Sequence, residues 1–168
     1  MYISEPVIRK GEYIAGIYTS PKNKAVLAIK KLSDLQSFTA VSTPKWRTDW
    51  QTLQVLPLKE IIQEDEWLSQ ARMVSLRWVD FLLMPFNSTP DQSFSMKKIH
   101  LVPVQNIGIE LKDSRHFVIS KNHPHGKAAF IAMNIGLNEL HNKNKIMQAY
   151  TESVFFINSN KVKILNVL

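Results

Sequence analysis

The stretch VSLRWVDFLLMPF, residues 74–86, decides the fold class. Val74 to Val79 ends a longer segment that has apolar residues at helical spacing, and Asp80 closes it. The run that follows, Phe81 to Phe86, is apolar at every position and has the length of a strand. A strand without polar alternation is buried on both faces, as happens when helices cover both sides of a sheet. The stretch therefore indicates an α/β fold.

Further strands and helices alternate on both sides of this stretch. Before it, the sequence predicts strands at Tyr13–Tyr18, Thr39–Val41 and Leu53–Leu58, a helix or turn at Ile29–Phe38, and helix over Glu60–Val79. After it come strand-like runs at Ile99–Val104, Ile107–Leu111 and His116–Ser120, helices from Pro124 and over Lys145–Phe155, and a short apolar tail strand. This order predicts one α/β domain over residues 1–168, with a five-stranded, mostly parallel sheet, one antiparallel member and flanking helices.

Composition limits the class of protein. The 168 residues are 45% hydrophobic and 21% charged, which is typical of a globular domain, and no apolar run approaches the roughly 20 residues of a membrane span. The absence of cysteine excludes disulfides and thiolate chemistry. The net charge of +7 comes from scattered lysine pairs, which favours a solvated surface over a nucleic-acid interface. Charged residues stand where a secretory signal has its apolar stretch, which indicates a cytoplasmic chain or one without its leader.

Motifs of catalysis, metal binding and cofactor binding are not found. The sequence has no GxSxG, HExxH or P-loop pattern, and its five glycines are dispersed. His123 and His125 flank Pro124 at the predicted start of a helix, which favours solvent-facing side chains over metal ligands. We therefore expect no catalytic residue, no metal site and no cofactor, and a binding protein rather than an enzyme.

Candidate binding residues follow two of the predicted strands. Ser42-Thr43-Pro44-Lys45-Trp46-Arg47 starts a helix with Pro44 in its first turn, where free N–H groups and the helix dipole favour an anion. A second group lies around the exit of the buried strand, at the edge where α/β proteins bind ligands. The predicted ligand-binding residues are Ser42, Thr43, Lys45, Trp46, Arg47, Arg77, Phe86 and Asn87. The alternative interpretation is a helix cap with surface cations and a core tryptophan, followed by an ordinary strand exit.

Four stretches, in this order, resemble the bacterial extracellular solute-binding proteins of family 3, the amino-acid-binding type. They are ISEPVIRKGEYIAGIYTS (3–20), IKKLSDLQSFTAVS (29–42), VSLRWVDFLLMPF (74–86) and HFVISKNHPHGKAAFIAMNIGLNELHNKNKIMQAY (116–150). The resemblance implies the second lobe of a periplasmic-binding-protein type II fold over about residues 20–122. Residues 1–19 and about 123–168 would be hinge and returning first-lobe segments. It also implies a periplasmic protein that captures a small polar or anionic solute, without chemical conversion, for an ABC transporter or a sensor.

Two departures from that family lead to further predictions. Most of the family's first lobe has no counterpart here, including the arginine that holds the ligand carboxylate, so exposed apolar surface at Ile14, Ile17, Phe155 and Phe156 predicts a homodimer. At the place of the family's amine-binding aspartate the chain has Met84-Pro85, which predicts a ligand without a free α-amino group. The alternative function is a cytoplasmic regulatory or nucleic-acid-binding module that uses the positive charge.

Overall fold

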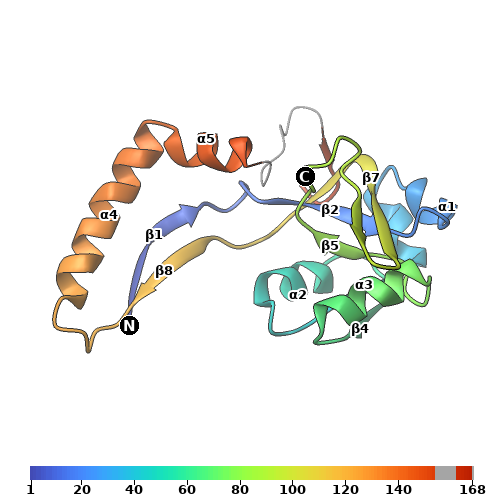
Figure 1. The fold of residues 1–168 in the computed structure, drawn as a ribbon, viewed down its shortest axis with the longest axis horizontal. Coiled ribbons are helices and arrows are strands. Elements are labelled where there is room, and N and C mark those ends of the chain that lie inside the picture. The colour runs from blue at the N-terminus through green and yellow to red at the C-terminus, as the bar shows by residue number, and fades with distance from the viewer. Residues whose placement is uncertain (154–161, 168) are drawn as a thin grey trace.

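A computed structural model describes residues 1–153 and 162–167 of the chain. The elements are β1 (Tyr2–Ile8), β2 (Ile14–Thr19), α1 (Lys24–Leu27), the 3₁₀ helix η1 (Leu32–Ser37), β3 (Thr39–Ser42), α2 (Arg47–Gln54), β4 (Glu60–Gln63), α3 (Trp67–Ser75), β5 (Leu82–Met84), β6 (Phe94–Met96), β7 (Ile99–Glu110), β8 (Arg115–Ile119), α4 (Gly126–Asn142), α5 (Lys145–Glu152) and β9 (Lys163–Ile164). Figure 1 shows two parts. The elements from β2 to β7, with β9, form what we call the body, and β1, β8, α4 and α5 form the arm.

The main sheet of the body has five strands, in the order β5-β2-β7-β6, with β9 added beside β7. Its pairs are antiparallel except for β7–β9. The prediction of a five-stranded, mostly parallel sheet is therefore not confirmed, because this sheet of five strands is mainly antiparallel. The chain enters the sheet along β2 and leaves it along the neighbouring β7 in the opposite direction, and β6 and β7 form a hairpin. An apolar run indicates that a strand is buried but not the direction of its partner strand. The antiparallel pairing could therefore not be predicted from the sequence.

Parallel pairing is confined mainly to a smaller sheet beside the main one. β3 and β4 pair in parallel, and a parallel bridge from Ala40 to Phe81 joins β3 to the residue before β5. Two predicted elements are corrected here. Residues 53–58 are not a strand, because α2 continues to Gln54 and Leu53 is buried together with Leu56 after one helical turn. The predicted helix over residues 60–79 begins instead with β4, and α3 starts only at Trp67.

Two clusters of buried side chains form the core of the body. The larger one contains Ile17, Leu35, Phe81 and Ile109, and the smaller one lies around Tyr18, Val74 and Leu101. β2 is buried at all six positions, because β5 and β7 flank it and side chains cover both of its faces. The predicted exposure of Ile14 and Ile17 is therefore wrong, since they are 6% and 0% exposed. Phe155 and Phe156 lie outside the described residues.

The arm is a two-stranded antiparallel sheet, β1 with β8, and α4 packs against it. Phe130 of α4 stacks on Tyr2 at 5.0 Å between ring centroids, and His141 Nε2 donates a hydrogen bond to the Pro6 carbonyl oxygen at 2.8 Å. Met147 and Tyr150 of α5 pack against the larger core cluster, which also includes Ile8 of β1. Among the described residues, no helix is long and apolar enough to cross a membrane.

Candidate functional site

A cleft of about 520 Å³ lies where the body meets the two segments that lead to the arm. Its lining residues come from five places in the chain. They are Tyr13, Trp46, Arg47, Thr48, Asp49, Trp67, Leu83, Met84, Pro85 and Arg115. Tyr13 precedes β2 and Arg115 begins β8, so both connections between body and arm contribute a side chain. The other residues come from the start of α2, the start of α3 and the end of β5.

Two tryptophans form an aromatic wall of the cleft. Trp46 is the N-cap residue of α2 and Trp67 is the first residue of α3, and their ring centroids are 6.2 Å apart with an interplanar angle of 48°. Trp67 also makes an edge contact with Phe94, with ring centroids 5.8 Å apart. Tilted aromatic pairs of this kind are favourable and restrict ring rotation. The wall is therefore a fixed apolar surface, of which Trp46 remains partly open to solvent.

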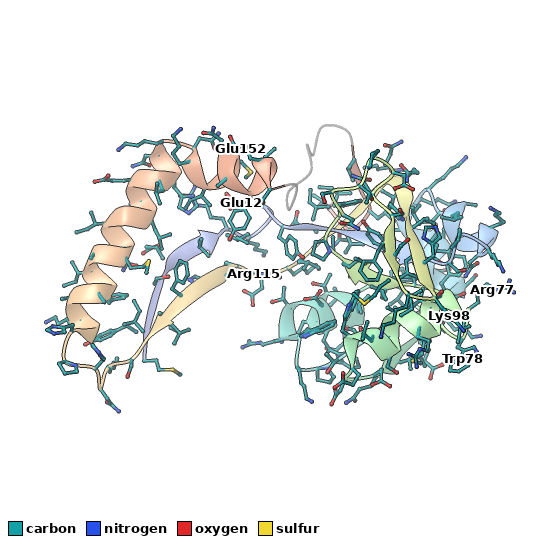
Figure 2. The ribbon with its side chains drawn as sticks, viewed as in Figure 1. Glu12, Arg77, Trp78, Lys98, Arg115 and Glu152 are labelled. Carbon is teal, nitrogen blue, oxygen red and sulfur yellow. The ribbon has the colours of Figure 1, made fainter. Side chains whose placement is uncertain are left out.

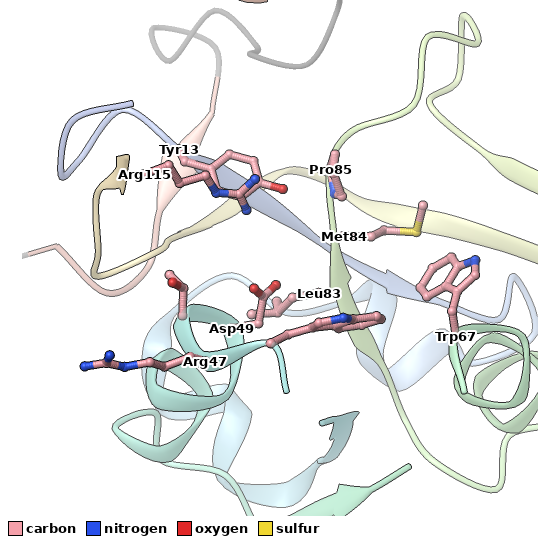
Figure 3. Close-up of a pocket in the computed structure, with 10 residues that line it drawn as sticks. Tyr13, Arg47, Asp49, Trp67, Leu83, Met84, Pro85 and Arg115 are labelled. Atoms are coloured by element: carbon pink, nitrogen blue, oxygen red, sulfur yellow. The ribbon is translucent and has the colours of Figure 1, made fainter. Parts of the chain in front are cut away.

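Opposite charges face each other across the cleft (Figure 3), where Arg115 lies beside Tyr13 and Asp49 lies across from them. The Arg115 guanidinium carbon is 4.4 Å from the centroid of the Tyr13 ring, which is a cation–π contact. Burial raises the pKa of Asp49 above its ordinary value, and the Arg115 charge partly offsets that rise. Burial also raises the pKa of Tyr13 to about 12, so its phenol is neutral at physiological pH.

The charges of Asp49 and Arg115 interact electrostatically, but the two side chains form no salt bridge within the described part of the chain. The two ion pairs found there are Lys45–Asp65 and Lys143–Glu139, both away from this pair. A half-buried carboxylate and a guanidinium that are close but not in direct contact can each bind a complementary group of a ligand. The cleft thus offers one anionic and one cationic binding position beside an apolar wall.

The loop before α2 is held by Asp65 rather than open toward the cleft. The Thr43 hydroxyl donates to Asp65 Oδ1 at 2.6 Å, and Lys45 Nζ lies 2.8 Å from Asp65 Oδ2. The hydrogen bond from Lys45 lowers the pKa of Asp65, and the same contact raises the pKa of Lys45. Two of the predicted ligand-binding residues are therefore occupied by a partner 22 positions further along the chain from Thr43.

Three other predicted residues lie in or next to this loop. Trp46 and Arg47 line the cleft, although the Arg47 guanidinium points away from Tyr13 and Arg115 in Figure 3. Ser42 is buried at the end of β3, and its hydroxyl has no hydrogen-bond partner among the described residues. α2 begins at Arg47, so Pro44 lies in the preceding turn, and its predicted place in the first helical turn is wrong.

The structure places the remaining predicted residues away from the cleft. Phe86 is buried against Tyr18, with ring centroids 6.3 Å apart. The Asn87 amide N–H donates to the Tyr18 hydroxyl, and its side chain donates to the Ser93 carbonyl oxygen, so Asn87 orders the loop after β5. Arg77 is at the opposite end of the body from Arg115 (Figure 2), and no cation–π contact with Trp78 is found in the described structure.

The cleft residues that the sequence did not single out include Tyr13, Asp49, Trp67 and Arg115. Asp49 follows Trp46 at helical i, i+3 spacing, which was a usable signal for a shared face. Tyr13 and Arg115 meet only because β2 and β7 run side by side and bring the two connections together. In addition, no group of three or more metal-ligating side chains is found in the described part of the chain.

The sequence matches no protein-family model and no curated protein. The fold does match solved structures. An amino-acid ABC transporter substrate-binding protein from Streptococcus pneumoniae bound to L-arginine has a TM-score of 0.59 at 11% identity, covering 93% of this chain and 61% of that chain. A probable amino-acid ABC transporter extracellular-binding protein from Bacillus subtilis gives 0.58 at 14% identity, with 90% and 62% covered.

An arginine transport periplasmic binding protein from Legionella pneumophila has a TM-score of 0.55 at 16% identity, over 92% of this chain and 65% of that one. The chain therefore spans less than two thirds of the length of the structures that it matches. Identities this low establish the fold alone. The resemblance seen in the sequence is confirmed at that level, because the chain has the α/β fold of amino-acid ABC transporter substrate-binding proteins.

Proposed function

We propose that this chain binds a small solute in the cleft between Trp46, Asp49 and Arg115 and does not convert it chemically. The observation that carries the proposal is a cleft with an aromatic wall and two opposite charges that are not paired with each other. Its volume of about 520 Å³ is within the range of roughly 300–1,000 Å³ that small-molecule sites occupy. Solute-binding proteins among the structural neighbours support the same reading.

The ligand that fits these charges is a zwitterion of amino-acid size or a small polar anion. Arg115 would bind a carboxylate, since a guanidinium forms strong charge-assisted hydrogen bonds with it. Asp49 would bind an ammonium or another donor, and such a partner would offset the cost of holding its charge in a buried place. Met84-Pro85 supply no carboxylate at the place of the family's amine-binding aspartate, but Asp49 lines the same cleft and would supply one. Ligands with an α-amino group are therefore included in the proposal.

The neighbours make amino acids the first ligands to test. Structures with this fold were solved with L-arginine and, for a glutamate-receptor ligand-binding core at 13% identity and a TM-score of 0.55, with L-glutamate. The described residues that line the cleft include no histidine, lysine or serine, which are common bases and nucleophiles, and its one carboxylate, Asp49, is the group that the proposal assigns to ligand binding. Tyr13, with its pKa raised to about 12, also stays protonated at neutral pH and cannot serve as a base there. These features favour binding over catalysis.

We extend the proposal to the chain's partners and location. A solute captured without conversion would be passed to a membrane transporter or reported to a sensor, and the chain would work on the extracytoplasmic side of the membrane. The support is the shared fold with periplasmic and extracellular binding proteins of ABC transporters. No feature of the cleft favours the nucleic-acid-binding alternative.

Calorimetry with a panel of L-amino acids and small carboxylates tests the proposal. We expect Arg115→Ala and Asp49→Asn each to weaken a zwitterionic ligand by about 10- to 100-fold, which corresponds to the loss of a hydrogen bond between charged groups. Arg77→Ala, at the other end of the body, is the matched control and should leave affinity unchanged. Arg47→Ala should have a smaller effect than Arg115→Ala, because its guanidinium points away from the cleft.

Two outcomes would count against the proposed site. If a ligand binds and Arg115→Ala leaves its affinity unchanged, the cationic position is elsewhere. If Arg47→Ala has the larger effect, the helix start predicted from the sequence is the binding position after all. Chemical change of a bound panel member, followed by mass spectrometry, would contradict binding without conversion.

A further inference from the structure

A second pocket, of about 410 Å³, lies between α3 and the turn that joins β6 to β7, toward the end of the body where Figure 2 shows Lys98. Its apolar walls include Leu68, Leu76 and Met96, which are 42%, 51% and 40% exposed. Trp78, which is 71% exposed, follows closely in the chain and lies at the same end of the body (Figure 2). Large apolar side chains that stay in water in this number mark an interaction surface.

Four cations surround these apolar side chains. Arg72, Lys97 and Lys98 line the pocket, and Arg77 adjoins Trp78. All four are exposed, and none forms a salt bridge with a carboxylate in the part of the chain that the structure describes. We call these four cations and the four exposed apolar residues the basic–apolar patch. The positive charge of the patch favours an anionic partner. Its exposed apolar side chains favour a partner that also buries apolar groups.

Two residues of the patch, Arg77 and Lys97, have left-handed backbone conformations. After α3, Arg77 adopts a left-handed conformation with φ 63°, the position where glycine is the usual residue. The Arg77 N–H donates to the Val74 carbonyl and the Trp78 N–H to the Met73 carbonyl, which is the Schellman pattern. In that motif an apolar residue after the helix commonly packs back on its last turn, whereas Trp78 stays exposed. Lys97 also has a left-handed conformation, with φ 53°.

We infer that the basic–apolar patch docks on the surface of a membrane containing anionic phospholipids. A bilayer interface accepts protruding tryptophan rings at headgroup level, and lysine and arginine reach its phosphates while their stems cover apolar groups. Anionic lipids attract such cations over short range. An acidic peptide would complement the charges but offers no layer in which Trp78 and Leu76 can be buried together.

The position of the patch is compatible with solute binding at the same time. Figure 2 shows Arg77, Trp78 and Lys98 at one end of the body and Arg115 near the cleft at the other. Docking through Arg77, Trp78 and Lys98 would therefore leave Arg115 away from the membrane surface. The inference does not depend on the proposed solute, because none of its residues line the cleft.

Vesicle co-sedimentation with the full chain tests this inference. We expect binding to vesicles of phosphatidylcholine with about one third phosphatidylglycerol, and little binding to phosphatidylcholine alone, since anionic lipid supplies the attraction. Lys97→Glu/Lys98→Glu should reduce the bound fraction by about tenfold or more, because each cation near the surface contributes to attraction and each carboxylate opposes it. Lys10→Glu/Lys127→Glu changes the net charge equally on exposed lysines of other segments, and should alter binding by less than about twofold.

Trp78 separates a membrane from a soluble polyanion. With brominated phosphatidylglycerol, wild-type fluorescence should be quenched, and Trp78→Phe should lose most of that quenching while its bound fraction stays near wild type. The inference is overturned if anionic vesicles do not bind, or if the control pair weakens binding as much as the patch pair. It is also overturned if polyglutamate binds as well as the vesicles do and Trp78 shows no quenching, which would assign the patch to an acidic protein segment.

Discussion

The body and the arm are built from similar amphipathic elements but differ in how completely these elements are covered. β2 in the body is buried at all six positions, whereas β8 in the arm has no buried residue among its five. α4 runs over 17 residues and buries only Gly126 and Leu137. Because burial of apolar surface is the main favourable term in folding, the body can be stable on its own interactions, and the arm depends on additional ones.

The interactions that position the arm are local and partly polar. The Glu5 N–H donates to Asn134 Oδ1 at 2.8 Å, and Tyr2 stacks on Phe130, so α4 is placed on β1 by a few specific interactions. Exposed apolar side chains remain around them, including Ile3 at 64%, Val118 at 59% and Ile135 at 58%. The arm is therefore the part of the structure in which local opening should cost least and a covering partner should add most.

The largest expected effect is on the body, at Asp80. Its Oδ2 accepts hydrogen bonds from the Thr39 N–H and hydroxyl, and its Oδ1 accepts one from the Asn23 side chain. Its carbonyl oxygen also accepts the Thr19 hydroxyl at 2.6 Å, so the residue links the ends of β2, α1 and β3. Asp80→Ala should lower the free energy of unfolding by about 2–4 kcal/mol, because several donors lose a charged acceptor.

Urea unfolding followed by tryptophan fluorescence measures this loss. Asp113→Ala, an exposed aspartate whose hydrogen bond is to the next residue, is the control and should change stability by no more than about 0.5 kcal/mol. Equal effects of the two substitutions would mean that the body does not depend on the Asp80 network.

Two glycines of α4 test the arm, and they should respond in opposite directions. A Cβ at Gly126 would lie 2.1 Å from the Ser120 carbonyl oxygen, whereas a Cβ at Gly136 would meet nothing within 4 Å. Gly126→Ala should destabilise the arm by about 1–3 kcal/mol, because a backbone atom must move. Gly136→Ala should stabilise it by about 0.5–1 kcal/mol, because alanine favours a helix interior.

Hydrogen exchange of α4 amides, compared with amides of β2, locates these effects. Changes limited to α4, α5 and β1 would confirm that the arm opens separately from the body. Equal changes in β2 would contradict that separation and indicate a single cooperative unit.

The body was easier to predict from sequence than the cleft, for a physical reason. The apolar runs around Tyr18 and Leu82 predicted buried strands, because a strand buried on both faces has apolar residues along its length. Strand direction did not follow, since β2 and β7 carry the same kind of side chains whichever way they run. The short parallel strand β4 was also missed, because its two isoleucines between a glutamate and a glutamine suit a helix equally well.

The cleft was only partly predicted, because its residues meet through tertiary interactions. Trp46 could be placed from a helix start alone. Thr43 and Lys45 have the same local signal, yet Asp65 holds them in a separate network. Arg115 is distant in sequence from every other lining residue, and only the pairing of β2 with β7 brings it to Tyr13. Local capping rules cannot distinguish a helix start that faces a ligand from one that faces its own chain.

The uncovered arm gives the third prediction, which is that the chain forms a homodimer through it. The prediction now rests on residues other than the buried Ile14 and Ile17, namely Ile3 and Val118, which pair in the β1–β8 register, and Ile131 and Ile135, which are one turn apart on α4. Ile135→Lys should raise the dissociation constant of the dimer by about tenfold or more, because the interface would have to bury an unpaired ammonium group.

Light scattering at micromolar concentration measures this change. Gln54→Lys, on an exposed position of α2 in the body, adds the same charge and should leave the dimer intact. A monodisperse wild-type monomer would contradict the prediction. A dimer that Ile135→Lys leaves unchanged would move the interface away from α4.

The smallest expected effect concerns Asp49, and it tests whether the body gives up stability to form its cleft. Burial raises the folded-state pKa of Asp49 above the ordinary value of 3.8, so the folded protein resists ionising this carboxyl more than the unfolded chain does. Asp49 therefore costs stability at neutral pH, and this cost disappears as the pH falls below the unfolded value, where both states are protonated. Asp49→Asn should accordingly stabilise the ligand-free chain at neutral pH, by about 1 kcal/mol or less.

Asp65 is the matched opposite, because the hydrogen bond from Lys45 lowers its pKa. Its contribution to stability is present above its unfolded pKa and is lost as the pH falls through the lower folded value, so Asp65→Asn should destabilise at neutral pH. Thermal melts of both variants from about pH 7 to about pH 2 separate the two signs, because the Asp49 cost ends near the unfolded pKa whereas the Asp65 contribution is lost only below it. With an ammonium-bearing ligand present, the advantage of Asp49→Asn should reverse, because only the ionised wild-type carboxylate can pair with the ligand. If Asp49→Asn stabilises the chain equally with and without bound ligand, Asp49 lies outside the binding site. Its burial would then lower stability without contributing to binding.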